Sequence, residues 1–262
     1  MIGIFDSGVG GMTVARAVER MLPDHRLIYF GDLARTPYGS KSPETIISYA
    51  RQNTEFLLAK GARLIVIACN SAASVASDDL PTRFNVPFFE VITPAVTKAV
   101  ASTVSGRIGV IGTRATVASG VYVKKIKAVN PDFQVFSQAC PLLVPLVEEG
   151  WMHKQETKMI LRRYLEPLKQ KCIDTLVLGC THYPLLIDLI QHRIGKRIKV
   201  IDSAEVLAAD LKNYLEQNPE IDNQLERGGD NLFFASDITE AAKSIAKNIF
   251  GREIRLDRAA WE

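Results

Sequence analysis

The sequence has no apolar run that approaches the roughly 20 residues of a membrane-spanning helix, and no basic start followed by an apolar stretch at its N-terminus. These absences argue against a membrane span and against a secretory signal peptide. Charge of one sign is not in excess, because 32 Lys and Arg residues face 29 Asp and Glu residues and no block of five basic residues occurs. Charge therefore gives no support to nucleic-acid or membrane-surface binding. We expect a cytoplasmic protein with no nucleic-acid or membrane partner.

Cysteine is also scarce. The 262 residues contain four, and no pair has the C-x-x-C spacing of a zinc ribbon or a thioredoxin-type redox site. No cluster of His, Cys and Asp has metal-ligand spacing. The glycine-rich segment 8–11 differs from G-x-G-x-x-G, and no Walker lysine follows it. We therefore expect no metal and no nucleotide, and we expect the thiols to be reduced.

Short apolar runs alternate with helix-like stretches along the chain. Ile2–Phe5 and Leu64–Ala68 are continuous apolar strands, and Pro43–Lys60 between them has a helical pattern with Ser42 placed to cap it. Continuous apolar strands separated by helices are typical of a parallel sheet that is covered on both faces. The hydrophobic content of 47% is that of an ordinary globular protein with a core of normal size.

The same pattern then restarts. The first strand of each half begins near Ile2 and Ile108, which are 106 residues apart. The strands that precede the two cysteines, Cys69 and Cys180, give a similar separation of 111 residues. We therefore predict an α/β fold of two pseudo-symmetric doubly wound domains, with mainly parallel sheets and the functional site in the cleft between them. A single doubly wound sheet is the alternative.

The C-terminal part is predicted to rejoin the first half. Residues 204–262 indicate a helix, a polar loop at 217–230, a short strand at 231–235 and a helix at 238–250. We predict a discontinuous first domain of residues 1–94 plus 208–262 and a second domain of residues 95–207. In the second domain, we expect one helix over 116–129.

Two cysteines stand at equivalent points of the two halves. Cys69 follows the apolar run that ends at Ala68 and precedes Asn70, while Cys180 follows Gly179 in the same setting. A cysteine between a strand and a helix N-terminus faces unpaired N–H groups and the helix dipole, which favour the thiolate. One thiol on each wall of a cleft suits an enzyme that removes a proton from one face of a carbon and returns it to the other.

The alternative for a free cysteine is the role of a small buried hydrophobe. We adopt that interpretation for Cys140 and Cys172, because neither leads from a strand into polar residues.

Two ionisable residues lie near these thiols in sequence. Asp6 ends the first strand, on the rim that carries Cys69, and His182 lies two residues beyond Cys180. Asp6 could accept a proton from the first thiol and His182 from the second. The alternatives are that Asp6 caps the turn at Gly8 and that His182 is a solvated or capping histidine.

The remaining polar residues of the predicted rim are hydroxyls and amides rather than cations. Such groups near helix starts can hold a carboxylate without a cationic clamp, which suits a small zwitterionic or acidic substrate. Taken singly, each Ser or Thr could equally be a helix cap. The residues concerned are Ser7, Gly39, Asn70, Ser71, Thr113, Thr116 and Thr181.

Five separated segments of the chain resemble glutamate racemases. They occur in the order of that family and spread over residues 3–184. They are FDSGVGG at 5–11, GD at 31–32 with PYG at 37–39, ACNSA at 68–72, GT at 112–113 with TV, S and Y at 116–122, and GCTHYP at 179–184.

The resemblance implies a cofactor-independent racemase of two similar α/β domains that supplies D-glutamate for bacterial peptidoglycan. It implies that Cys69 and Cys180 are the two acid/base residues, assisted by Asp6 and His182. Racemases of this type often pair, so a homodimer is possible.

The resemblance also implies a set of substrate contacts. An acidic residue assists the site, and of the adjacent Glu148 and Glu149 we favour Glu148. The implied contacts are Asp6, Ser7, Pro37, Tyr38, Gly39, Asn70, Ser71, Thr113, Thr116, Thr181 and His182, with Asp32 in a supporting role.

One departure from the family pattern is visible. The family usually has threonine after Cys-Asn, where this chain has Ser71, so the hydroxyl is kept and a methyl is lost. Aspartate racemases usually carry an acidic residue at the position of His182, which favours glutamate as the substrate. Three other functions stay open: a racemase for aspartate or another amino acid, a non-catalytic binding protein for acidic amino acids, and a thiol-dependent hydrolase with one nucleophile.

Overall fold

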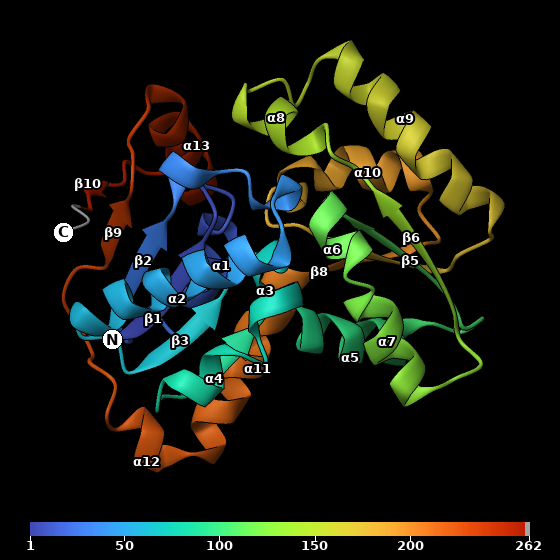
Figure 1. Cartoon of the computed structure of the whole chain (residues 1–262). Helices are drawn as coiled ribbons and strands as arrows, with labels where there is room; N and C mark the ends of the chain where they lie inside the picture. Colours follow the sequence, from blue (N-terminus) through green and yellow to red (C-terminus); the bar gives the residue numbers. More distant parts are fainter. Residues whose placement is uncertain (260–262) are drawn as a thin grey trace.

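The computed structural model describes residues 1–259, which form two α/β halves that lie side by side (Figure 1). Each half has its own sheet, and every strand pair in both sheets is parallel. The first sheet has the order β10-β9-β2-β1-β3-β4 and the second has the order β6-β5-β7-β8. The predicted fold class is confirmed.

The two sheets share one topology. The order β2-β1-β3-β4 of the first half matches the order β6-β5-β7-β8 of the second. In the first sheet Ile2 pairs with Leu64, and in the second Ile108 pairs with Thr175. The strands are β1 (Ile2–Asp6), β2 (Leu27–Gly31), β3 (Leu64–Ile67), β4 (Phe88–Glu90), β5 (Arg107–Gly112), β6 (Gln134–Ala139), β7 (Thr175–Gly179), β8 (Lys199–Asp202), β9 (Leu232–Ala235) and β10 (Asp257–Arg258).

The central strands are apolar because both of their faces are covered. All residues of β1 and β3 are buried, as expected for strands between two helical layers. The helices are α1 (Met12–Met21), α2 (Pro43–Ala59), α3 (Asn70–Ala76), α4 (Leu80–Arg83), α5 (Ile92–Ser102), α6 (Arg114–Ala118), α7 (Val121–Val129), α8 (Leu143–Glu148), α9 (Gln155–Gln170), α10 (Ile187–Ile194), α11 (Ser203–Gln217), α12 (Pro219–Asp222) and α13 (Glu240–Phe250), with 3₁₀ turns η1 (Leu33–Arg35), η2 (Tyr38–Ser40) and η3 (Tyr183–Leu186).

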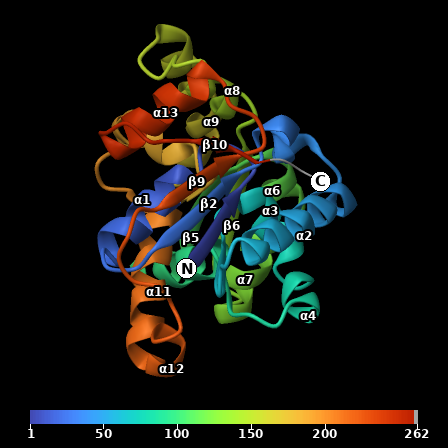
Figure 2. The ribbon, with the colours of Figure 1, turned by 90° about the vertical axis from the view of Figure 1, so that its left-hand side faces the viewer.

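The C-terminal segment returns to the first half, as the sequence indicated. Strand β9 pairs with β2, and β10 extends the same edge; Figure 2 shows these strands beside β2 with α13 packed nearby. Helix α11 contacts α1 of the first half and α5, β7 and β8, so it joins the two halves. The boundaries at 94/95 and 207/208 fall inside α5 and α11 and stay a prediction.

Several local expectations need correction. The helix expected over 116–129 is two helices, α6 and α7, because Gly120 adopts a left-handed conformation with φ of 67°. Helices α4, α5, α8 and α12 and strands β8 and β10 were not anticipated, and α12 lies inside the segment 217–230 that was expected to be a loop. Cys172 is exposed and not a small buried hydrophobe, since it lies in the turn after α9 with a positive φ of 49°.

Ser42 caps α2 as predicted, by accepting a hydrogen bond from the N–H of Thr45.

In the described part of the chain, none of the helices combines the length and the hydropathy that crossing a bilayer requires.

Candidate active site

The loops that follow β1, β3, β5 and β7 meet between the two sheets and enclose a cavity. Cys69 after β3 lines it from the first half, and Cys180 after β7 lines it from the second. About 20 Å³ of the cavity is open to the centre of a water molecule, which is room for about one or two waters. Its lining residues are Ser7, Thr36, Pro37, Tyr38, Gly39, Cys69, Asn70, Ser71, Thr113, Val144, Cys180, Thr181 and His182.

Cys69 occupies the N-cap position of α3 and is 4% exposed. Its thiol donates to the hydroxyl oxygen of Ser7 at 3.5 Å. Burial, followed by the nearby charge of Asp6, raises the pKa of Cys69 to about 12. The backbone N–H of Ala72 in α3 lowers this pKa, in the direction expected at a helix N-terminus, but burial outweighs that effect. Desolvation disfavours the charged sulfur more than a helix of two turns stabilises it.

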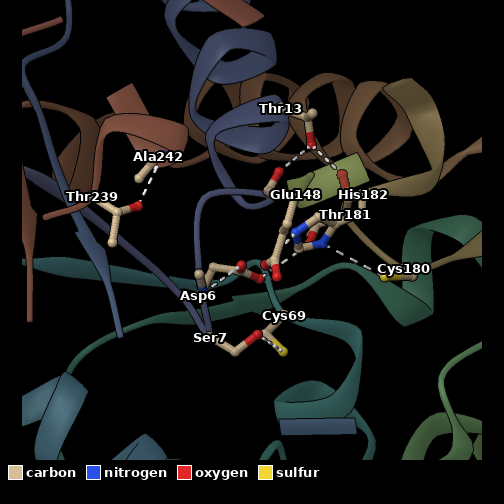
Figure 3. A network of polar contacts seen from close by, with 12 residues as sticks. Asp6, Ser7, Thr13, Cys69, Glu148, Cys180, Thr181, His182, Thr239 and Ala242 are labelled. Carbon is tan, nitrogen blue, oxygen red and sulfur yellow. Dashed lines mark hydrogen bonds and ion pairs between the residues drawn. The ribbon is translucent and has the colours of Figure 1, made fainter. Parts of the chain in front are cut away.

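Cys180 is the first of three residues in a polar chain. Its Sγ lies 3.9 Å from Nδ1 of His182, and the Nε2 of His182 lies 3.2 Å from an Oε1 of Glu148 on α8 (Figure 3). Burial on its own lowers the pKa of His182, but the hydrogen bonds to Cys180 and Glu148 outweigh it and raise that pKa to about 10. The imidazole is therefore protonated at neutral pH. The geometry favours Glu148 over Glu149 as the acid that meets the histidine.

Asp6 lies behind the cavity wall, between the two halves. Its carboxylate accepts from the backbone N–H of Gly8 at 3.0 Å and from the hydroxyl of Thr181 at 3.3 Å. The side chain is completely buried, and burial raises its pKa. Asp6 thus caps the turn at Gly8, which was the alternative interpretation, and also joins the loop after β1 to the loop after β7.

Hydroxyl contacts cross the boundary between the halves at a second point. Ser71 Oγ lies 2.8 Å from Thr113 Oγ1, which in turn lies 3.0 Å from Thr116 Oγ1. Thr113 also caps α6. Gly39 packs against Thr113 so closely that a Cβ at residue 39 would come within 2.6 Å of the Thr113 Cβ. Thr116 therefore supports Thr113 from outside the cavity.

Asp32 does not line the cavity but supports a residue that does. Its buried carboxylate accepts from the hydroxyl of Tyr38, from Arg35 at 2.6 Å and from Ser236 at 2.9 Å. Asn53 donates to the Tyr38 hydroxyl at 3.1 Å. This network fixes the segment that carries Tyr38 and Gly39 at the mouth of the site, which agrees with a supporting role.

Sequence reasoning missed two lining residues. Thr36 directly precedes Pro37 in the polar loop after β2, so its neighbours in sequence could have indicated it. Val144 lies on α8, where an apolar residue in a short helix has the same pattern as a core residue. Its position on the cavity wall follows only from the packing of α8 on η3.

Metal chemistry has no evident location in this region. The described residues, 1–259, contain no group of three His, Cys, Asp or Glu side chains arranged to hold a metal ion. The cavity offers instead two thiols, one imidazolium, and a set of hydroxyl and amide donors. Such a set can bind the carboxylate of a ligand and can exchange protons with a carbon atom held between the two sulfurs.

Comparison with known proteins gives a consistent result. The family model for Asp/Glu/Hydantoin racemase matches residues 12–211. A glutamate racemase of Geobacter metallireducens is 43% identical over 253 residues, which cover 97% of this chain and 93% of the relative.

Solved structures agree with the sequence comparison. A glutamate racemase isoform of Bacillus anthracis is 36% identical with a TM-score of 0.91, and the alignment covers 99% of this chain and 97% of that one. The glutamate racemase of Francisella tularensis, solved with D-glutamate, is 33% identical with a TM-score of 0.90 and the same coverage.

Proposed function

Since the chain belongs to the Asp/Glu/Hydantoin racemase family, with glutamate racemases as its relatives, we propose that it interconverts L- and D-glutamate by moving one proton between Cα and two cysteines, Cys69 and Cys180. The observation that carries this proposal is that the two thiols line one cavity from opposite halves of the molecule. A racemase needs one base on each face of the stereocentre, and a single nucleophile would not call for the second thiol.

The surroundings of the two sulfurs suggest which cysteine acts first as the acid and which as the base. Cys69 is held as a thiol, because its pKa is raised to about 12. A positive His182 lies beside the Cys180 sulfur, where it would stabilise negative charge. In one direction the Cys180 thiolate takes the Cα proton and the Cys69 thiol delivers its own proton to the opposite face. In the other direction the roles are exchanged.

The intermediate carries negative charge on the substrate carboxylate. We propose that the hydroxyl and amide donors of the cavity stabilise this charge, because fixed donors in a site that excludes water supply much of the rate enhancement of many enzymes. The substrate contacts proposed are Ser7, Pro37, Tyr38, Gly39, Asn70, Ser71, Thr113, Thr181 and His182. Four further residues contact these side chains from outside the cavity lining and would hold them in place: Asp6, Asp32, Thr116 and Glu148.

We also propose for this chain the biological role of its family. D-glutamate made by this reaction would supply peptidoglycan synthesis in the cytoplasm. The reaction would need no cofactor, because both proton transfers use side chains of the chain. A homodimer is the proposed assembly.

The test is proton NMR of L-glutamate with the pure protein in heavy water. We expect loss of the Cα proton signal and formation of D-glutamate, with no added pyridoxal phosphate, nucleotide or metal. Cys69→Ser and Cys180→Ser should each abolish racemisation in both directions, while Cys172→Ser, at an exposed position outside the cavity lining, should retain it.

The outcomes separate the rival functions. Binding without any exchange of the Cα proton would indicate a binding protein. Faster turnover of aspartate than of glutamate would indicate the other substrate. Normal turnover in either cysteine-to-serine variant would contradict the two-base scheme, and a trapped covalent adduct on one sulfur would indicate a hydrolase.

A further inference from the structure

Tyr122 is a buried residue of α7 that lies between the loops carrying the two cysteines. Its side chain is 2% exposed. Its hydroxyl donates to the Oδ1 of Asn70, the residue after Cys69, at 2.7 Å. Its ring packs over Gly179, the residue before Cys180, so that a Cβ at residue 179 would lie 3.3 Å from the ring. Tyr122 therefore contacts the neighbours of both thiols.

In the described part of the chain, only the oxygen of the Asn70 carboxamide has a hydrogen-bond partner. Its Oδ1 accepts from Tyr122, while its Nδ2 is buried and has no hydrogen-bond partner among the residues that the structure describes. Asn70 is 2% exposed and lines the cavity. A buried donor without a partner is unfavourable in the free protein, and an acceptor on a bound ligand removes that penalty.

The hydroxyl of Tyr122 is a hydrogen-bond donor at neutral pH. Burial, followed by the charges of Glu90 and Cys180, raises the pKa of Tyr122 well above its usual value. A protonated phenol that donates to Oδ1 holds the carboxamide in the orientation in which Nδ2 points away from the tyrosine.

We propose that Tyr122 is a positioning residue, which orients the Asn70 carboxamide so that its free Nδ2 donates to a carboxylate oxygen of the bound amino acid. Tyr122 itself does not line the cavity. It acts through Asn70, and its ring packs over Gly179, the last residue of β7. This inference rests on the proposed function for the identity of the ligand, but the binding readout of its test does not require turnover.

The test is a double-mutant cycle of Tyr122→Phe and Asn70→Ala, with racemisation kinetics and calorimetric binding of D-glutamate as readouts. Tyr122→Phe keeps the ring on Gly179 and removes only the hydroxyl. We expect it to lower kcat/KM and to weaken D-glutamate binding by about tenfold each. In the Asn70→Ala background the same change should alter either quantity by less than about twofold.

Tyr183→Phe is the matched control. Tyr183 is equally buried, and its hydroxyl donates to the backbone carbonyl of Cys140 at 3.0 Å, which cannot be reoriented as an amide can. Its effect should be the same with and without Asn70. If Tyr122→Phe is also independent of Asn70, its role is structural only and the proposal is wrong.

Failure of the proposed function would look different. If the wild-type protein binds D-glutamate but does not racemise it, the racemase proposal fails and the binding cycle still decides the role of Tyr122. If the wild-type protein does not bind D-glutamate, both proposals are overturned.

Discussion

At the scale of single residues, the protonation of the cavity depends on partners as much as on burial. Burial by itself would leave His182 neutral, yet hydrogen bonds to Cys180 and Glu148 hold its proton. The charge that acts most strongly on Cys69 is the negative one of Asp6, which adds to burial in keeping the sulfur protonated. Two cysteines in equivalent positions of a repeat thus have different electrostatic surroundings, because a carboxylate acts on Cys69 whereas an imidazole lies beside Cys180.

The raised pKa of His182 predicts a pH-dependent contribution to stability. A histidine whose pKa rises from 6.5 to about 10 on folding stabilises the native state fully below pH 6.5, and this contribution is lost as the pH rises through about 10. The difference in unfolding free energy between the wild type and His182→Gln should therefore shrink from pH 6 to pH 10. Urea denaturation at several pH values measures it.

His153→Gln is the control for this experiment, because His153 is exposed. It should show no such trend. A difference between the wild type and His182→Gln that stays constant from pH 6 to pH 10 would mean that folding does not raise the affinity of His182 for its proton.

At the scale of elements, the glycine-rich loop between β1 and α1 decides how closely the halves approach. A Cβ at residue 10 would lie 2.6 Å from the Cε1 of His182 and 2.7 Å from the hydroxyl of Thr181. Thr13, at the start of α1, donates to the backbone carbonyl of Thr181 at 3.1 Å. The loop therefore packs directly on the residues after Cys180, and only glycine fits there.

Gly10→Ala should lower kcat/KM by at least about 100-fold, because displacing His182 and Thr181 by even about an ångström misplaces the groups around Cys180. The matched control is Gly8→Ala in the same loop. Its nearest neighbour would be the Thr36 hydroxyl at 3.4 Å, an ordinary contact. Steady-state kinetics should show a change of less than about threefold for Gly8→Ala. Equal losses in the two variants would contradict the packing argument.

At the scale of the whole molecule, the cavity is too small for its proposed ligand. A space that admits about one or two waters does not hold glutamate. The contacts that close it join the two halves, such as Ser71 to Thr113 and Asp6 to Thr181. We infer that the halves separate to admit the substrate and close again around it.

This closure predicts an order of thiol modification. Cys172 is exposed, whereas Cys69 and Cys180 are buried. A thiol reagent should modify Cys172 first, with racemisation retained, and then the two cavity cysteines as the halves open. Saturating D-glutamate should slow only that second phase. Mass spectrometry of digested samples measures the order, and modification of Cys69 as fast as that of Cys172 would mean that the cavity is open in solution.

The amino-acid sequence by itself determined the repeat, the parallel sheets and the positions of the two cysteines. These features are encoded locally: apolar runs such as Leu64–Ala68 specify buried strands, and a polar residue after a strand marks the edge where loops gather. The break between α6 and α7 was also local, but a single glycine is compatible with a continuous helix as well as with a left-handed turn.

The tertiary structure alone decided which residues work together. Glu148 meets His182, and Tyr122 meets Asn70, because separate segments pack side by side, not because of spacing along the chain. It also decided the protonation of Cys69, since desolvation depends on every neighbour that excludes water. Sequence patterns report which face of an element is buried, whereas charge states and hydrogen-bond partners depend on the distances between elements.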